Sequence, residues 1–153
     1  STPTGHNPTS RTTPELAKAL AGDAVPESLA ARVTAHRGDL FADPFPPGAE
    51  AVLFSHVLEI FPAERVIELL AKAFEALPYG GRVLLYGFNV TDDEQRGVFS
   101  ARLSLYLNAV ASGSGMAYPA SDYESWLREV GFREVTTLTG LPYEHGLTEG
   151  IKP

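Results

Sequence analysis

The chain has 153 residues, of which 44% are hydrophobic, so it is long enough and apolar enough to fold as one globular domain. Its 19 Asp and Glu outnumber its 12 Lys and Arg, and the net charge of −7 argues against nucleic acid as a partner, because no basic excess is present to displace counterions. No apolar run approaches the roughly 20 residues of a membrane span. No signal peptide is visible, and the absence of Cys excludes disulfides and thiolate metal sites and fits a cytoplasmic protein.

The first third of the chain contains little regular pattern. Residues 1–13 are rich in Ser, Thr, Pro and Gly, and we expect them to form a flexible tail. A short helical pattern follows over Pro14–Leu20. Val33–Arg37 is a strand candidate that ends before Gly38, and the apolar run Ala51–Phe54 suits a buried strand.

The middle of the chain alternates helix and strand. Pro62–Leu77 has apolar residues at helical spacing, and Pro at the first turn costs no hydrogen bond. Arg82–Phe88 is a second apolar run suited to a buried strand. Thr91 and Glu94 have the spacing of a capping box, which predicts a helix over Asp92–Val110.

The last third predicts one helix and two strands. Ser121 and Glu124 repeat the capping-box spacing, and Gly131 is suited to end the helix that follows. Glu134–Thr139 and Gly146–Ile151 are strand candidates that can pair as a hairpin. This order predicts an α/β fold: a mainly parallel sheet with the two middle strands at its centre, helices on its faces, and a late antiparallel strand pair.

Three predicted strand ends carry polar or small residues. They are Asp39, the pair Ser55 and His56, and residues 87–89 (GFN). In open α/β sheets ligands bind at the carboxyl ends of the strands, so we expect a site where these ends meet.

His56 lies at a junction of strand and helix, and three interpretations are open. It can line a substrate pocket, or it can share a metal ion with Glu59, which lies three residues further along the chain. It can also be a half-buried ring whose nitrogen bonds a backbone carbonyl. Two ligands do not complete a metal site, so we predict no metal, with His56 as the ligand in the alternative interpretation.

Three stretches together carry a resemblance to a known family: residues 38–41 (GDLF), residues 53–61 (LFSHVLEIF) and residues 76–88 (ALPYGGRVLLYGF). Their order and spacing resemble the C-terminal half of the cofactor domain of S-adenosylmethionine-dependent small-molecule methyltransferases, in particular the plant-type and bacterial O-methyltransferase group. The resemblance covers about residues 28–153. It implies that residues 14–153 form an incomplete Rossmann-like methyltransferase fold that lacks the glycine-rich first βα unit.

The resemblance also implies cofactor-binding residues. In the family, the acidic residue that matches Asp39 contacts the adenine of S-adenosylmethionine, and the next two residues, here Leu40 and Phe41, pack on the ring. Gly38 belongs to the same turn, and Ser55 lies at the next strand end, so we expect both to bind the cofactor. The other interpretation of Asp39 is that it caps a loop.

Glu59 departs from the family pattern. The family has its catalytic His in a Leu-His-Asp-Trp segment, where this chain reads LEIF over residues 58–61. Glu59 therefore occupies the position of the general base. A carboxylate can act as a base, or it can complement the dipole of the helix that follows. The family's two supporting glutamates are absent: one would fall near Gly87, and the other near Met116 or Ala117.

The resemblance implies methyl transfer from S-adenosylmethionine to a small-molecule metabolite, with O-methylation of a hydroxyl as the main expectation and Glu59 and His56 as candidate catalytic residues. Two alternatives stay open: metal-assisted C-methylation of an α-keto acid, in which His56 helps to hold the metal, and a non-catalytic binding or dimerisation module. The family also implies a homodimer, formed through an N-terminal domain missing from this chain. We expect the isolated chain to be inactive, to bind the cofactor weakly, and to leave one sheet edge unpaired.

Overall fold

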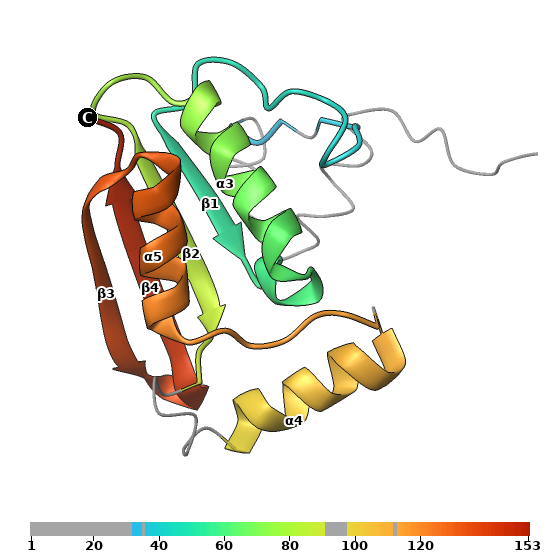
Figure 1. The fold of residues 1–153 in the computed structure, drawn as a ribbon. Coiled ribbons are helices and arrows are strands. Elements are labelled where there is room, and N and C mark those ends of the chain that lie inside the picture. Colours follow the sequence, from blue (N-terminus) through green and yellow to red (C-terminus); the bar gives the residue numbers. More distant parts are fainter. Residues whose placement is uncertain (1–31, 35, 91–97, 112) are drawn as a thin grey trace, which may run out of the picture. The chain divides into compact units, whose positions relative to one another are not determined.

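The computed structural model describes residues 32–34, 36–90, 98–111 and 113–153 (Figure 1). The chain divides into two compact units, residues 1–39 and residues 40–153. Every helix and strand described below belongs to the second unit. The expected tail and the short helix over Pro14–Leu20 lie outside the described residues.

The second unit is built on a four-stranded mixed sheet with the order β1-β2-β4-β3. Its strands are β1 (Ala51–Ser55), β2 (Arg82–Phe88), β3 (Arg133–Leu141) and β4 (His145–Ile151). β1 and β2 are parallel, whereas β4 is antiparallel to both β2 and β3. The predicted α/β class and the late antiparallel pair are confirmed. Within the described residues the sheet is mixed rather than mainly parallel, because the short β3–β4 connection reverses the chain and β4 inserts beside β2.

β1 forms an edge of the described sheet, so the prediction that it lies at the centre is wrong for this part of the chain. The other strand predicted to be central, β2, does lie inside the sheet, between β1 and β4. Across the described residues, no strand pairs with the outer edge of β1. An open edge presents unpaired N–H and C=O groups, which agrees with the unpaired edge that the sequence led us to expect.

Two helices cover one face of the sheet (Figure 1). They are α3 (Ala63–Ala76) and α5 (Ala120–Val130), which lie side by side and bury apolar residues at helical spacing. The strands β1 and β2 supply the facing apolar side chains. The fully buried core residues are Val66, Leu69, Leu70, Ala73, Val83, Leu127 and Phe132.

The ends of α5 correct one prediction and agree with another. The expected capping box of Ser121 and Glu124 is wrong: the helix begins at Ala120, its N-cap is Pro119, and no side chain caps it. The fixed ring of Pro119 presets a φ of −58° at the entry, and the helix starts two residues earlier than it would with Ser121 as its N-cap. Gly131 ends the helix as expected, with a φ of 123° and its N–H bonded to the Leu127 carbonyl.

The helix α4 (Val98–Tyr106) continues into a π-helical turn over Leu107–Ala111. The predicted helix is therefore confirmed over its second half, while Thr91 and Glu94 lie outside the described residues. The Glu144 carboxylate accepts hydrogen bonds from the N–H groups of Phe99 at 3.3 Å and Ser100 at 2.9 Å. Burial pushes the pKa of Glu144 upward, but these backbone bonds outweigh it and hold the pKa below its usual value. The first turn of α4 is thereby fixed to the turn between β3 and β4.

The predicted strand Val33–Arg37 is wrong. The described residues 32–34 and 36–39 contain no strand. A strand is stabilised by ladder hydrogen bonds to a neighbour, and none of the four strands in the described sheet pairs with this segment. As for membranes, no described helix is both long and apolar enough to cross a bilayer.

Candidate active site at the carboxyl ends of β1 and β2

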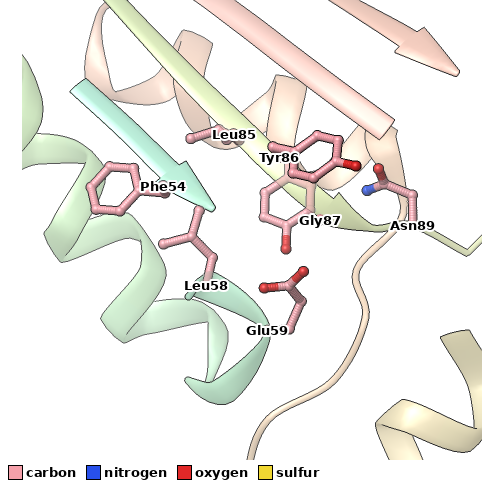
Figure 2. Close-up of a pocket in the computed structure, with 8 residues that line it drawn as sticks. Phe54, Leu58, Glu59, Leu85, Tyr86, Gly87 and Asn89 are labelled. Atoms are coloured by element: carbon pink, nitrogen blue, oxygen red, sulfur yellow. The ribbon is translucent and has the colours of Figure 1, made fainter. Parts of the chain in front are cut away.

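The chain turns sharply where β1 ends. Ser55 is the last strand residue, and His56 has a left-handed φ of 52°, a conformation that residues with a side chain rarely adopt. The His56 N–H donates to the Tyr86 carbonyl at 2.9 Å, which fixes the turn on β2. The short 3-10 helix η2 (Leu58–Ile60) follows and brings Glu59 to the carboxyl end of β2 (Figure 2).

The Glu59 carboxylate is buried against the backbone of β2. Glu59 is only 4% exposed, and its Oε1 accepts a hydrogen bond from the Phe88 N–H at 3.0 Å. Gly87 makes room for it, because a Cβ at Gly87 would lie 1.8 Å from Oε1 of Glu59. Two features noted separately in the sequence, the carboxylate at residue 59 and the missing side chain at residue 87, therefore form one arrangement.

His56 lies beside Glu59. Its Nδ1 is 3.8 Å from Oε1 of Glu59, a distance at which the two form an ion pair when the imidazole is protonated. The His56 ring also packs at 5.3 Å from Tyr86 and 5.2 Å from Phe88, measured between ring centroids. The structure thus brings together the two residues that the sequence nominated for catalysis.

A second histidine completes this aromatic group. His145 stacks on Tyr86 with centroids 5.1 Å apart and lies 4.9 Å from His56. Its Nδ1 donates to the Pro142 carbonyl at 2.6 Å, so in the neutral ring Nε2 is an acceptor. That Nε2 atom is buried, and none of the described residues forms a hydrogen bond with it. The wall beside His56 is therefore aromatic, with one polar atom inside it.

A small pocket opens next to Glu59 (Figure 2). It has an empty volume of about 210 Å³, part of which is open to solvent. Tyr123 of α5 lines it, and burial raises the pKa of the Tyr123 hydroxyl well above its usual value, with the charge of Glu59 raising it further. The lining residues are Phe54, Leu58, Glu59, Leu85, Tyr86, Gly87, Asn89 and Tyr123.

A buried carboxylate in a pocket at the ends of two parallel strands, flanked by aromatic side chains, is the arrangement of an active site in an α/β protein. A family model described as an O-methyltransferase domain matches residues 14–133, more than half of the chain. This chain belongs to the O-methyltransferase domain family.

This O-methyltransferase domain is 35% identical over 136 residues to the 3-hydroxy-5-methyl-1-naphthoate 3-O-methyltransferase of Streptomyces sahachiroi, covering 88% of this chain and 39% of that enzyme. It is 38% identical over 108 residues to the L-tyrosine C(3)-methyltransferase of Streptomyces lavendulae, covering 71% of this chain and 30% of that enzyme. The solved structure of SibL, an S-adenosylmethionine-dependent methyltransferase in its apo form, matches with a TM-score of 0.71 and 34% identity over 77% of this chain and 35% of SibL.

These similarities confirm the family resemblance and the Rossmann-like α/β fold that the sequence predicted. The chain spans well under half of the length of each relative.

The residues expected to bind the cofactor fall into two groups. Gly38 and Asp39 belong to the first compact unit, residues 1–39. Leu40 and Phe41 belong to the second unit, where the Lys72 ammonium donates to the carbonyls of Leu40 at 2.5 Å and Phe41 at 3.1 Å. Ser55 lies exposed at the end of β1. The O-methyltransferase domain therefore holds Leu40 and Phe41 on α3, while Ser55 occupies the predicted strand end.

The Phe41 ring has a defined environment. It meets Phe61 edge-on at a centroid distance of 5.0 Å, and the Arg65 guanidinium lies 3.5 Å from its centroid. This packing orients a half-buried aromatic side chain two residues after Asp39. A flat ring fixed in this way suits the packing role that the family resemblance implies.

The alternative interpretation of His56, as a metal ligand, requires further ligands beside Glu59. Among the described residues, no group of three or more His, Cys, Asp and Glu side chains is arranged to hold a metal ion. His56 and Glu59 stay a pair, in contact with aromatic neighbours rather than with a third ligand.

Two features of the site escaped the sequence analysis. In the sequence, Tyr123 has the spacing of an ordinary core residue, because it lies one helical turn before Leu127. Gly115 approaches η2 so closely that a Cβ there would lie 2.3 Å from the Glu59 carbonyl oxygen. The sequence offers two nearby glycines, Gly113 and Gly115, which suit a hinge between two helices, but it gives no sign of this contact.

Proposed function

We propose that the protein transfers a methyl group from S-adenosylmethionine to a hydroxyl on a small aromatic metabolite. The observation that carries this proposal is the Glu59 carboxylate, buried and fixed by the Phe88 N–H where the family has its base. Membership of the O-methyltransferase domain family supports the reaction class. The relative from Streptomyces sahachiroi, named for O-methylation of a hydroxynaphthoate, supports the substrate class.

The residues present fit the cofactor. Leu40 and Phe41 offer apolar surface for the adenine, and the exposed Ser55 hydroxyl at the end of β1 offers a hydrogen-bond partner for a polar group. When bound, S-adenosylmethionine supplies an electrophilic methyl group. Asp39 is proposed to accept a hydrogen bond from the adenine amino group.

Glu59 is proposed to act as the general base. Its Oε1 accepts the Phe88 N–H, and its second oxygen, Oε2, is proposed to take the proton. A substrate hydroxyl beside this carboxylate loses its proton to Glu59, and its oxygen becomes a stronger nucleophile. His56, 3.8 Å from Oε1, completes the polar wall on the solvent side.

The two alternatives from the sequence are less well supported. C-methylation of an α-keto acid needs a metal to stabilise the enolate, and His56 has only Glu59 as a second potential ligand among the described residues. A non-catalytic module would not require a buried carboxylate at the position of the base, because burying a charged group costs free energy.

The reaction can be tested with the intact protein, S-adenosylmethionine carrying a ¹³C-labelled methyl group, and 3-hydroxy-5-methyl-1-naphthoate. We expect a product whose labelled methyl is attached to oxygen, as read from its NMR chemical shift. A methyl group on a ring carbon would replace O-methylation by carbon methylation, the reaction for which the Streptomyces lavendulae relative is named. No transfer to this compound or to any of a panel of phenols and naphthols would contradict the proposal.

We further propose that the enzyme is a cytoplasmic homodimer. The dimer follows from the family resemblance, and the absence of Cys fits a reducing compartment. Light scattering on the intact protein measures the oligomeric state directly.

Replacing Asp39 by Ala in the intact protein should weaken cofactor binding by about 1 to 3 kcal/mol, because the adenine amino group would lose its acceptor. Isothermal titration calorimetry with S-adenosylmethionine measures this change. Glu50→Ala, which removes an exposed carboxylate just before β1, is the matched control and should leave the affinity unchanged. Equal affinities for the Asp39→Ala variant and the wild type would remove Asp39 from the cofactor site.

A further inference from the structure

Tyr123 of α5 contributes a hydroxyl group that the proposed reaction has not yet been given a role for. The residue is only 5% exposed, and its ring is held edge-on by Tyr118 at 5.8 Å and Trp126 at 5.6 Å. Tyr123 lines the pocket beside Glu59. A hydroxyl in a pocket wall can donate a hydrogen bond to a group that enters the pocket.

The Glu59 carboxylate has room to accept further hydrogen bonds. Among the described residues its carboxylate accepts a hydrogen bond from the Phe88 N–H, whereas a carboxylate has room for about four. The Tyr123 hydroxyl would be a natural donor, yet the two groups are not hydrogen-bonded to each other within the described structure. Both residues line the same pocket, so a group that enters it can meet a donor, the Tyr123 hydroxyl, and an acceptor, the Glu59 carboxylate.

The pocket has the size of a subsite rather than of a whole ligand site. The space inside it is only about 10 Å³, roughly the room that one water molecule needs. Apart from Glu59, Asn89 and the Tyr hydroxyls, its lining is apolar or Gly. It can therefore take one polar group at the end of an otherwise apolar substrate.

We propose that Glu59 and Tyr123 together hold one phenolic hydroxyl of the substrate, with Glu59 accepting its proton and the Tyr123 hydroxyl donating a hydrogen bond to its oxygen. This inference rests on the proposed methyl transfer and adds to it the group that stabilises the substrate oxyanion. Tyr123 is thus a catalytic residue that touches the reacting oxygen.

The chemistry favours a phenol over an aliphatic alcohol. A phenol has a pKa of about 10, as the Tyr side chain does, which is far closer to that of a carboxylate than the pKa of about 16 of bulk water. The substrate O–H bond breaks and its proton passes to Glu59. The same oxygen gains the methyl group, and the sulfonium leaves as a neutral thioether.

Tyr123 itself is suited to donate. Burial and the Glu59 charge raise its pKa, so its hydroxyl keeps its proton while Glu59 accepts the substrate proton. A hydrogen bond to a developing oxyanion is stronger than one to a neutral hydroxyl, so it stabilises the transition state more than the ground state.

The kinetic test compares Tyr123→Phe with Tyr118→Phe in the intact protein, with 3-hydroxy-5-methyl-1-naphthoate as the substrate. Tyr118 is equally buried, but its hydroxyl already donates to the Phe61 carbonyl at 2.8 Å. We expect Tyr123→Phe to lower kcat by about 10- to 100-fold, with a much smaller change in KM. Tyr118→Phe should lower protein stability and leave kcat within about threefold. Equal losses of kcat in both variants would overturn the role of Tyr123.

A binding test does not depend on methyl transfer. The probe is 4-nitrophenol, whose absorbance reports whether it is bound as phenol or as phenolate. We expect it to bind the wild type and Tyr118→Phe alike, and Tyr123→Phe about tenfold more weakly. No binding to the wild type, or equal binding to all three proteins, would overturn the subsite. Binding that depends on Tyr123 without any methyl transfer to phenols would contradict the proposed function and leave the subsite standing.

Discussion

Replacing Glu59 by Gln is expected to lower kcat by about 10²- to 10⁴-fold, the usual contribution of a general base. Gln has the size of Glu and retains a carbonyl oxygen that can accept the Phe88 N–H, so the hydrogen bond at 3.0 Å can persist. What the variant loses is the ability to take the substrate proton. Steady-state kinetics with a hydroxynaphthoate substrate measures the fall, and calorimetry with S-adenosylmethionine should give an unchanged affinity.

Two results separate this role from a structural one. The matched control is Glu75→Gln, which removes an exposed carboxylate from α3 and should leave kcat unchanged. A fall of less than about threefold for Glu59→Gln would remove Glu59 from the mechanism. A fall in kcat together with an equal fall in cofactor affinity would point to a misshapen site instead.

Gly87 explains why a glutamate can occupy this position. In the family, a supporting glutamate would fall near residue 87, and a side chain there would collide with the Glu59 carboxylate, since even a Cβ would lie 1.8 Å from Oε1. The observed position of the Glu59 carboxylate therefore requires a glycine at position 87. Both departures, Glu59 and Gly87, can be seen in the sequence. That they contact each other follows only from the packing of η2 against β2.

The middle of the fold could be predicted from the sequence because its local signals agree. Arg82–Phe88 is an unbroken apolar run between glycines and polar residues, and its predicted bounds are those of β2. The helix predicted over Pro62–Leu77 is α3 with one residue fewer at each end, because Pro62 and Leu77 are its caps. Short-range periodicity and Pro positions decide such elements, and they need no knowledge of distant contacts.

The remaining errors come from long-range effects. The Val33–Arg37 segment has strand-like composition, but composition supplies no pairing partner, and no described strand pairs with it. The order of the sheet was also out of reach, because β4 is inserted between β2 and β3 by pairing across more than 50 residues of chain. Tyr123 was missed for a related reason: its hydroxyl matters only because Glu59 lines the same pocket.

Replacing Phe132 by Ala is expected to lower the free energy of unfolding by about 3 to 5 kcal/mol, the cost of removing a fully buried Phe and leaving a cavity. Phe132 is 0% exposed and is the largest fully buried side chain. Its ring meets Phe74 of α3 edge-on at 5.0 Å, and its Cβ would lie 3.1 Å from a Cβ added at Gly150 of β4. Ala keeps the Cβ that faces Gly150 but removes the whole ring, so Phe74 of α3 would lose its edge-on contact and a cavity would remain in the core.

Urea unfolding of the purified protein, followed by circular dichroism, measures this loss. Phe99→Ala is the matched control, because it removes the same atoms from a residue of α4 that is 56% exposed, where such changes usually cost no more than about 0.5 kcal/mol. A loss below about 1 kcal/mol for Phe132→Ala, or equal losses in the two variants, would contradict a core centred on Phe132. Because α3 and β2 also position Glu59, a loosened core should reduce methyl transfer as well, but only at temperatures where the variant begins to unfold.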